Sequence, residues 1–107
     1  MNNTWISCSK TISLNNYRAS QHFAQRAEAR HLSEDQVQFA LLFGTRMYCG
    51  GACAYIVRRQ DIPVGTDAKL VRRYHGMVVI TTLDSFKLVT TYQDPHAYTQ
   101  MKKKFRH

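Results

Sequence analysis

Three cationic side chains recur at intervals of four residues early in the chain: His22, Arg26 and Arg30. On a helix, residues four apart drift by only about 40° per step, so these side chains form one stripe. Histidine suits proton transfer because its unperturbed pKa of about 6.5 lies near neutral pH. Arginine offers phosphate oxygens a fixed fork of donors. One bound phosphate group could therefore contact all three residues.

Two predicted helices hold this stripe in place. The first begins at Ser20, a favourable N-cap residue, and carries a small apolar face beside the stripe. A second helix begins near Glu34, because Ser-Glu-Asp-Gln at 33–36 has the form of a capping box with acidic residues toward the positive end of the helix dipole. We expect Gly44 to end this helix in the left-handed conformation that is common at helix C-termini.

The composition favours an anionic partner. Among 107 residues, 15 Lys and Arg oppose 7 Asp and Glu, for a formal net charge of +8. RNA, DNA, an acidic protein and an anionic membrane surface are all compatible with this charge. No run approaches the roughly 20 apolar residues of a membrane span, and the first ten residues lack the apolar core of a secretory signal. We therefore expect a cytoplasmic protein with no membrane partner.

The cysteines allow two interpretations. Cys49 and Cys53 could supply two metal ligands, but no second pair follows at zinc-finger spacing, and the five histidines contain no H-x3-5-H pair. The alternative is a hairpin turn at Gly50-Gly51 flanked by half-buried, reduced thiols. This second interpretation fits better, and we expect neither a metal site nor a cofactor.

The rest of the chain predicts a sheet and a short terminal helix. Residues 45–58 and 77–93 each have the composition of a hairpin, the second turning at 83–84. Between them, residues 59–74 predict a long basic loop with one short element. Asp94-Pro95 then begins a terminal helix that docks on the sheet.

These elements predict an α+β domain over residues 20–107, preceded by an arm at 1–19. Two N-terminal helices pack on a four-stranded antiparallel sheet, and a short C-terminal helix follows. Strict alternation in the last strand would place Leu88, Thr90 and Tyr92 on one face of the sheet.

Further basic residues are candidates for contacts with a phosphate backbone. Four lie around the loop and three in the terminal helix: Arg58, Arg59, Arg72, Arg73, Lys102, Lys103 and Lys104. The alternative for the three lysines is a solvated last turn, where cations suit the helix dipole.

The His22-x3-Arg26-x3-Arg30 stripe, the Ser-Glu-Asp-x-Val segment from Ser33, the helix ending at Gly44 and the closing Val-Thr-Thr-Tyr strand resemble the DUF4258 family. That family is similar to the wider barnase, EndoU, colicin and RelE-like (BECR) group of metal-independent ribonucleases and toxins. The resemblance covers residues 20–93. It departs at Gln93, where a Tyr-Arg pair would fit the family pattern and complete a phosphate clamp.

The resemblance implies an endoribonuclease of toxin type, held in check by an acidic antitoxin or immunity protein. It points to His22, Arg26, Arg30, Thr90 and Tyr92 as the catalytic residues. In such a reaction the 2′-hydroxyl of the RNA attacks the phosphate, one group takes its proton, another protonates the departing 5′ oxygen, and cations stabilise the phosphorane. Tyr92 would transfer a proton if nearby cations lowered its pKa from about 10, or would stack on a base.

Two other functions fit the same residues. The protein would be a non-catalytic nucleic-acid-binding or protein-binding module if the basic face were present without an acid-base pair. It would be an interaction protein if the positive surface docked an acidic protein. In both cases His22 is a surface histidine, and Arg26 and Arg30 pair with Glu28 or Glu34.

Overall fold

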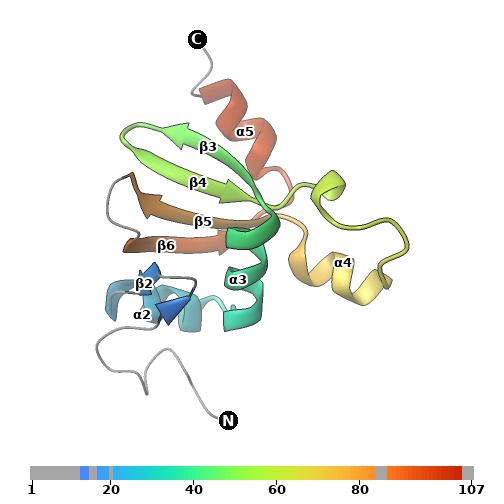
Figure 1. Ribbon diagram of the computed structural model, residues 1–107, viewed down its shortest axis with the longest axis horizontal. Coiled ribbons are helices and arrows are strands. Elements are labelled where there is room, and N and C mark those ends of the chain that lie inside the picture. The colour runs from blue at the N-terminus through green and yellow to red at the C-terminus, as the bar shows by residue number, and fades with distance from the viewer. Residues whose placement is uncertain (1–12, 15–16, 20, 84–86, 105–107) are drawn as a thin grey trace.

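The computed structural model describes residues 13–14, 17–19, 21–83 and 87–104 (Figure 1). It confirms the predicted α+β fold, with two N-terminal helices on an antiparallel sheet and a short C-terminal helix. The predicted helix start at Ser20 and part of the turn after Leu83 lie outside the described residues.

The sheet is an antiparallel meander extended at one edge. Its four main strands are β3 (Thr45–Cys49), β4 (Ala52–Ile56), β5 (Met77–Thr82) and β6 (Lys87–Gln93). Two short strands, β2 (Tyr17–Ala19) and β1 (Ser13–Leu14), continue it in the order β1-β2-β6-β5-β4-β3. β2 runs parallel to β6 and pairs only with its start, at Lys87 and Leu88. The rest of β6 therefore has an edge that β2 does not cover.

The helices form two layers on the sheet. They are α2 (Gln21–Ala29), α3 (Glu34–Phe43), α4 (Ala68–Tyr74) and α5 (Ala97–Lys104), with a short 3-10 helix η1 (Arg59–Asp61). α2 and α3 pack on one face around Phe23, Val37 and Met77. α5 packs on the other face, where Ala97 meets Ile56 and Val78 with Tyr98 alongside. The sheet is thus covered on both faces.

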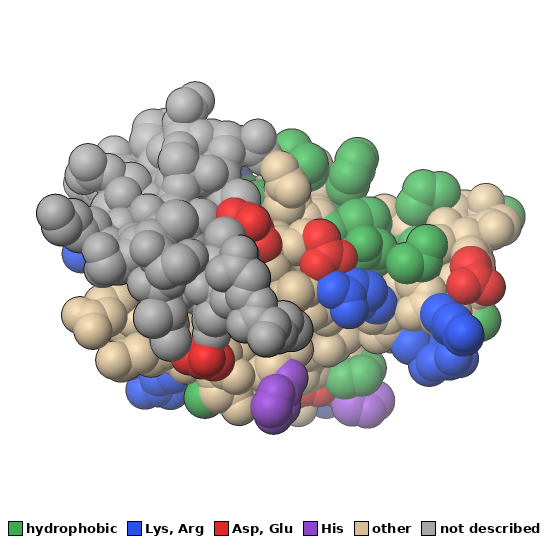
Figure 2. All heavy atoms as spheres, turned by 90° about the horizontal axis from the view of Figure 1, so that it is seen from below, with side chains coloured by type: hydrophobic (Ala, Val, Ile, Leu, Met, Phe, Trp, Pro, Cys, Tyr) green, Lys and Arg blue, Asp and Glu red, His purple; other side chains and the backbone are tan. Residues whose placement is uncertain are grey.

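α4 lies outside these layers and buries none of its residues. It is the short element predicted within the loop at residues 59–74, and it projects from the end of the sheet (Figure 1). Seen from below, hydrophobic side chains gather over α3 and α4, with charged side chains beside them (Figure 2). Leu42, Phe43 and Leu70 are among the exposed apolar residues.

A bulge in β6 changes the predicted faces of that strand. Ile80 pairs with Thr90 but Thr81 pairs with Leu88, so Val89 has no partner in β5. The extra residue reverses the alternation, and Leu88 packs in the core under α2 and α3. Tyr92 packs in the core under α5. The expectation that Leu88, Thr90 and Tyr92 share a face was therefore wrong for Leu88.

The helix ends also differ from expectation at one position. Gly44 has φ −69°, so it is extended and not left-handed. A glycine is still needed, because a Cβ there would lie 2.5 Å from the carbonyl oxygen of Ala40. The left-handed residue is His31, with φ 56°, at the end of α2. There Leu32 N–H donates to Ala27 O and His31 N–H to Glu28 O, which is the Schellman arrangement.

Candidate nucleic-acid interface

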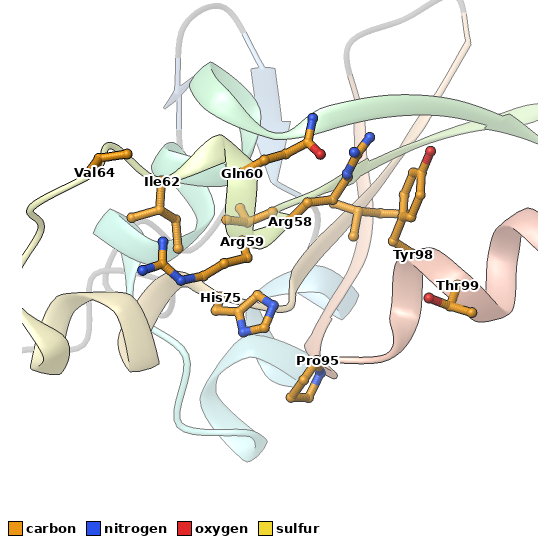
Figure 3. Close-up of a pocket in the computed structure, with 11 residues that line it drawn as sticks. Arg58, Arg59, Gln60, Ile62, Val64, His75, Pro95, Tyr98 and Thr99 are labelled. Atoms are coloured by element: carbon orange, nitrogen blue, oxygen red, sulfur yellow. The ribbon is translucent and has the colours of Figure 1, made fainter.

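A groove opens at the end of the sheet where β4 ends, β5 begins and β6 ends. These three ends coincide because the strands are antiparallel neighbours, with Ile56 opposite Val78 and Met77 opposite Gln93. The groove has a volume of about 660 Å³. Its lining comes from β4 and η1, from the start of β5, and from the start of α5: Ile56, Val57, Arg58, Arg59, Gln60, Ile62, Val64, His75, Pro95, Tyr98 and Thr99. Figure 3 shows Arg58 and Tyr98 together on one side and Arg59 with His75 on the other.

Arg58 is held at both ends. Its backbone N–H donates to Oδ2 of Asp61 at 2.9 Å, and the same oxygen accepts the Thr45 hydroxyl at 2.8 Å. Its guanidinium lies over the ring of Tyr98, 4.2 Å from the centroid, in cation-π contact. The turn after β4 and the first turn of α5 are thereby joined on one side of the groove.

His75 is placed by the glycine that follows it. Gly76 N–H donates to Val57 O at 2.9 Å, and Gly76 O accepts from Asp94 N–H at 2.8 Å, so this residue joins three segments. Its φ of 85° is left-handed, and a Cβ would lie 2.7 Å from backbone atoms of Asp94 and Pro95. Only glycine fits both demands. The half-buried His75 is therefore held between Pro95 and the end of α4.

A second hollow adjoins the groove and brings in Arg72. It is lined by Arg72, His75, Gln93 and Pro95, so the two hollows share His75 and Pro95. Gln93 Nε2 lies within 3.1 Å of the carbonyl oxygens of Arg72, Arg73 and His75. Gln93 thus fixes the C-terminal turn of α4 against β6.

The α5 lysines extend the positive surface. Lys102 Nζ lies 6.0 Å from the centroid of the Tyr98 ring, on the same ring that Arg58 contacts. Lys103 and Lys104 are exposed in the last turn of the helix. Arg58, Arg59, Arg72 and Lys102 therefore gather around one groove from segments far apart in the sequence.

Arg73 differs from the other predicted phosphate contacts. Its Nε and Nη2 donate to the two carboxylate oxygens of Asp35 at 2.9 and 2.7 Å, and Nη2 also reaches Ser33 Oγ at 2.5 Å. Tyr74 donates to the same carboxylate at 3.1 Å. The hydrogen bond from Arg73 in particular holds the pKa of Asp35 well below its usual range. The guanidinium of Arg73 is thus committed to joining α4 to α3.

The predicted catalytic residues are divided between two sides of the sheet. His22 and Arg26 are exposed on α2, and neither side chain bonds to another residue in the described ranges. Tyr92 packs with the α5 core, and Thr90 pairs with Ile80 of that same core. Arg30, which follows α2, contacts the strand that carries Thr90 and Tyr92. Its Nη1 donates to Thr91 O at 2.8 Å, on the part of the β6 edge that β2 does not cover.

Tyr92 does not have the lowered pKa that proton abstraction would need. Burial raises its pKa, and the negative charge of Asp94 adds to the effect, whereas Arg30 opposes it more weakly. Tyr92 is therefore a neutral hydroxyl near neutral pH and can donate a proton but not accept one.

The two cysteines of the C-x3-C segment are not brought together as ligands. Gly50 and Gly51 turn the β3-β4 hairpin with φ of 57° and 86°, as the turn interpretation predicted. Cys49 pairs with Ala52 and Cys53 with Tyr48, so strand alternation sends the two thiols to opposite faces of the sheet.

Sequence reasoning missed the groove residues His75 and Tyr98. His75 comes directly after the predicted loop at 59–74, and Tyr98 belongs to the terminal helix that was expected to dock on the sheet. Gly76 and Pro95 were the signal that could have located these two residues. Gly76 precedes one predicted strand of a hairpin and Pro95 follows the other, so the two turns they mark lie at the same end of the hairpin.

Comparison of the chain with protein-family models, curated proteins and solved structures found no match. No helix in the described part of the chain has the length and apolarity to cross a bilayer.

Proposed function

We propose that the protein binds RNA through the groove at the end of β4, β5 and β6. The observation that carries the proposal is that Arg58 and Arg59 line the groove and Arg72 lines the hollow beside it, with His75 lining both. Guanidinium groups bind phosphate oxygens through paired hydrogen bonds, and releasing counterions from a polyanion supplies much of the affinity. The resemblance to ribonucleases favours RNA over DNA, and an acidic protein that covers the groove would be the natural inhibitor.

Metal-independent endoribonuclease activity is the second candidate. One observation favours it: Arg30 of the predicted stripe donates to Thr91 O of β6 and lies close enough to Tyr92 to act on its pKa. His22 would take the proton of the 2′-hydroxyl, Arg26 and Arg30 would stabilise the phosphorane, and the neutral Tyr92 would protonate the leaving 5′ oxygen. Thr90 would hydrogen-bond a phosphate oxygen.

The binding test uses fluorescence anisotropy with a labelled RNA oligonucleotide at fixed salt. We expect the double variant Arg59→Gln/Arg72→Gln to bind at least tenfold more weakly. Arg46→Gln, which removes a charge from the exposed face of β3, should leave the affinity nearly unchanged. Equal losses of binding free energy per charge removed in the two proteins would mean that net charge alone attracts RNA. Tighter binding of a matching DNA would overturn the choice of RNA.

The cleavage test uses total RNA in excess EDTA and examines fragment ends for cyclic phosphate. General acid-base groups contribute roughly 10²- to 10⁴-fold, so His22→Ala should remove nearly all cleavage. Loss of cleavage in His75→Ala but not in His22→Ala would move the chemistry into the groove. Intact RNA with every protein, at high concentration, would leave a binding module.

A further inference from the structure

We propose that the groove holds an unpaired nucleobase, so that the ligand is single-stranded RNA. This inference rests on the proposed function and adds the strandedness of its ligand. The inference is based on the side chains that line the groove beside its cations. They include apolar side chains, an aromatic ring and polar side chains without hydrogen-bond partners among the described residues, and a site that binds only phosphates does not need them.

The groove has an apolar floor and an apolar rim. Ile56, Val57 and Ile62 are almost fully buried beneath it. Val64 is fully exposed and Pro95 is exposed at its margin. A duplex presents mainly phosphates and sugars to a groove of this kind, so the exposed rim at Val64 and Pro95 would stay uncovered, whereas a base turned out of a single strand would cover it.

A stacking surface forms one wall. The Arg58 guanidinium carbon lies 4.2 Å from the centroid of the Tyr98 ring, and Lys102 Nζ lies over the same ring at 6.0 Å. Bases in single-stranded RNA stack on aromatic rings and on arginine planes alike. With Asp61 holding its backbone, Arg58 is fixed in position before any ligand arrives.

Two polar side chains are available for the edge of a base. Gln60 and Thr99 line the groove, and neither makes a hydrogen bond to another residue in the part of the chain described. An amide and a hydroxyl together offer donors and acceptors to Watson-Crick edges, which are exposed only when a base is unpaired. Arg59 and His75, on the opposite side in Figure 3, are then placed for the flanking phosphates.

The test compares three RNA ligands of one length by anisotropy: a single strand, its duplex, and the same strand with abasic sites in place of its bases. The abasic strand keeps its phosphates, so it measures backbone contacts alone. We expect the single strand to bind about tenfold or more tightly than either of the others, which is the typical effect of losing one stacked base.

Variants locate the effect in the groove. Tyr98→Leu should weaken binding to the single strand about tenfold and leave binding to the abasic strand unchanged, whereas Tyr98→Phe should behave as the parent. Tyr48→Leu is the control, because Tyr48 also lies under an arginine, with its ring centroid 5.3 Å from Arg46, but is exposed and outside the groove.

Equal affinity of the parent protein for the intact and abasic strands would overturn the base site while leaving the proposed RNA binding in place. So would tighter binding of the duplex. Failure to bind any of the three RNAs would instead overturn the proposed function, and the base site with it.

Discussion

Asp35 is the residue at which protonation and folding are most clearly coupled. Arg73 binds both of its carboxylate oxygens, and hydrogen bonds from Ser33 and Tyr74 add to the pair. Both side chains of the pair are about half exposed, at 42% for Arg73 and 50% for Asp35, so solvent screening limits the pair to about 1 kcal/mol.

We expect Asp35→Asn to lower the free energy of unfolding at pH 7 by about 1 kcal/mol. The pKa of Asp35 is lower in the folded than in the unfolded protein, where it is about 3.9. The stabilisation is therefore complete above the unfolded pKa and is lost as the pH falls below about 4 toward the folded pKa. Urea unfolding at several pH values should show the parent and the variant converging in acid.

Glu34→Gln is the control, because Glu34 lies beside Asp35 in the first turn of α3 and forms no ion pair with a described residue. Glu34 interacts with the helix dipole as Asp35 does, but it does not pair with Arg73. A difference between parent and Asp35→Asn that persisted unchanged to pH 2 would contradict the assignment.

The individual site residues were only partly predictable. The sequence identified Arg58, Arg59 and Arg72 by charge alone; the first two line the groove and the third lines the hollow beside it. It could not show that Arg73, next to Arg72 on α4, turns the other way to Asp35, because that contact joins residues 38 apart in the sequence. His75 was assigned no role for a similar reason, since its neighbours in the groove come from other strands.

At the scale of elements, boundaries that depend on local chemistry were predicted well. The capping residues at the start of α3 were read correctly, and the Gln36 side chain accepts the Ser33 N–H at 3.0 Å. The Gly50-Gly51 turn was also correct. The bulge at Val89 was not foreseen, because strand alternation has a period of two and nothing in the local sequence marks an extra residue.

The shape of the groove depends on Gly76, because its backbone hydrogen bonds join the start of β5 to the end of β6 and to the turn after β4. We expect Gly76→Ala to destabilise the protein by more than about 2 kcal/mol, because a left-handed φ and a clash with backbone atoms act together. Thermal or urea unfolding measures the change.

Gly65→Ala separates the two causes. Gly65 has a similar φ of 91°, but a Cβ there would meet nothing within 4 Å. We expect this control to lose only about 1 kcal/mol, from backbone strain alone. If the two alanine variants were equally stable, the close approach of Gly76 to Asp94 and Pro95 would not be holding the groove together.

At the scale of the whole molecule, only some of the cations behind the net charge of +8 are available to bind RNA. Arg73 is neutralised by Asp35, and Arg46 lies on β3, where its Nη2 donates to the Tyr48 hydroxyl at 2.8 Å. The groove cations Arg59 and Arg72 make no ion pair with any acidic residue in the described ranges. Only cations near the bound strand should release counterions from it.

The salt dependence of RNA binding tests this distribution. For a single strand, each phosphate contact contributes about −0.7 to the slope of log affinity against log salt. We expect Arg59→Gln and Arg72→Gln each to make the slope shallower by about 0.7, and Arg46→Gln to leave it unchanged although it removes the same charge. Anisotropy titrations across a series of salt concentrations give the slopes directly.

Arg73 gives the sharpest form of the same prediction. Arg73→Gln should change the slope little, because the guanidinium is already paired with Asp35 in the folded protein. Asp35→Asn should release that guanidinium at the end of α4, next to Arg72, and make the slope steeper by up to about 0.7. If instead all four arginine variants changed the slope equally, a diffuse attraction by net charge would replace the groove as the explanation for binding.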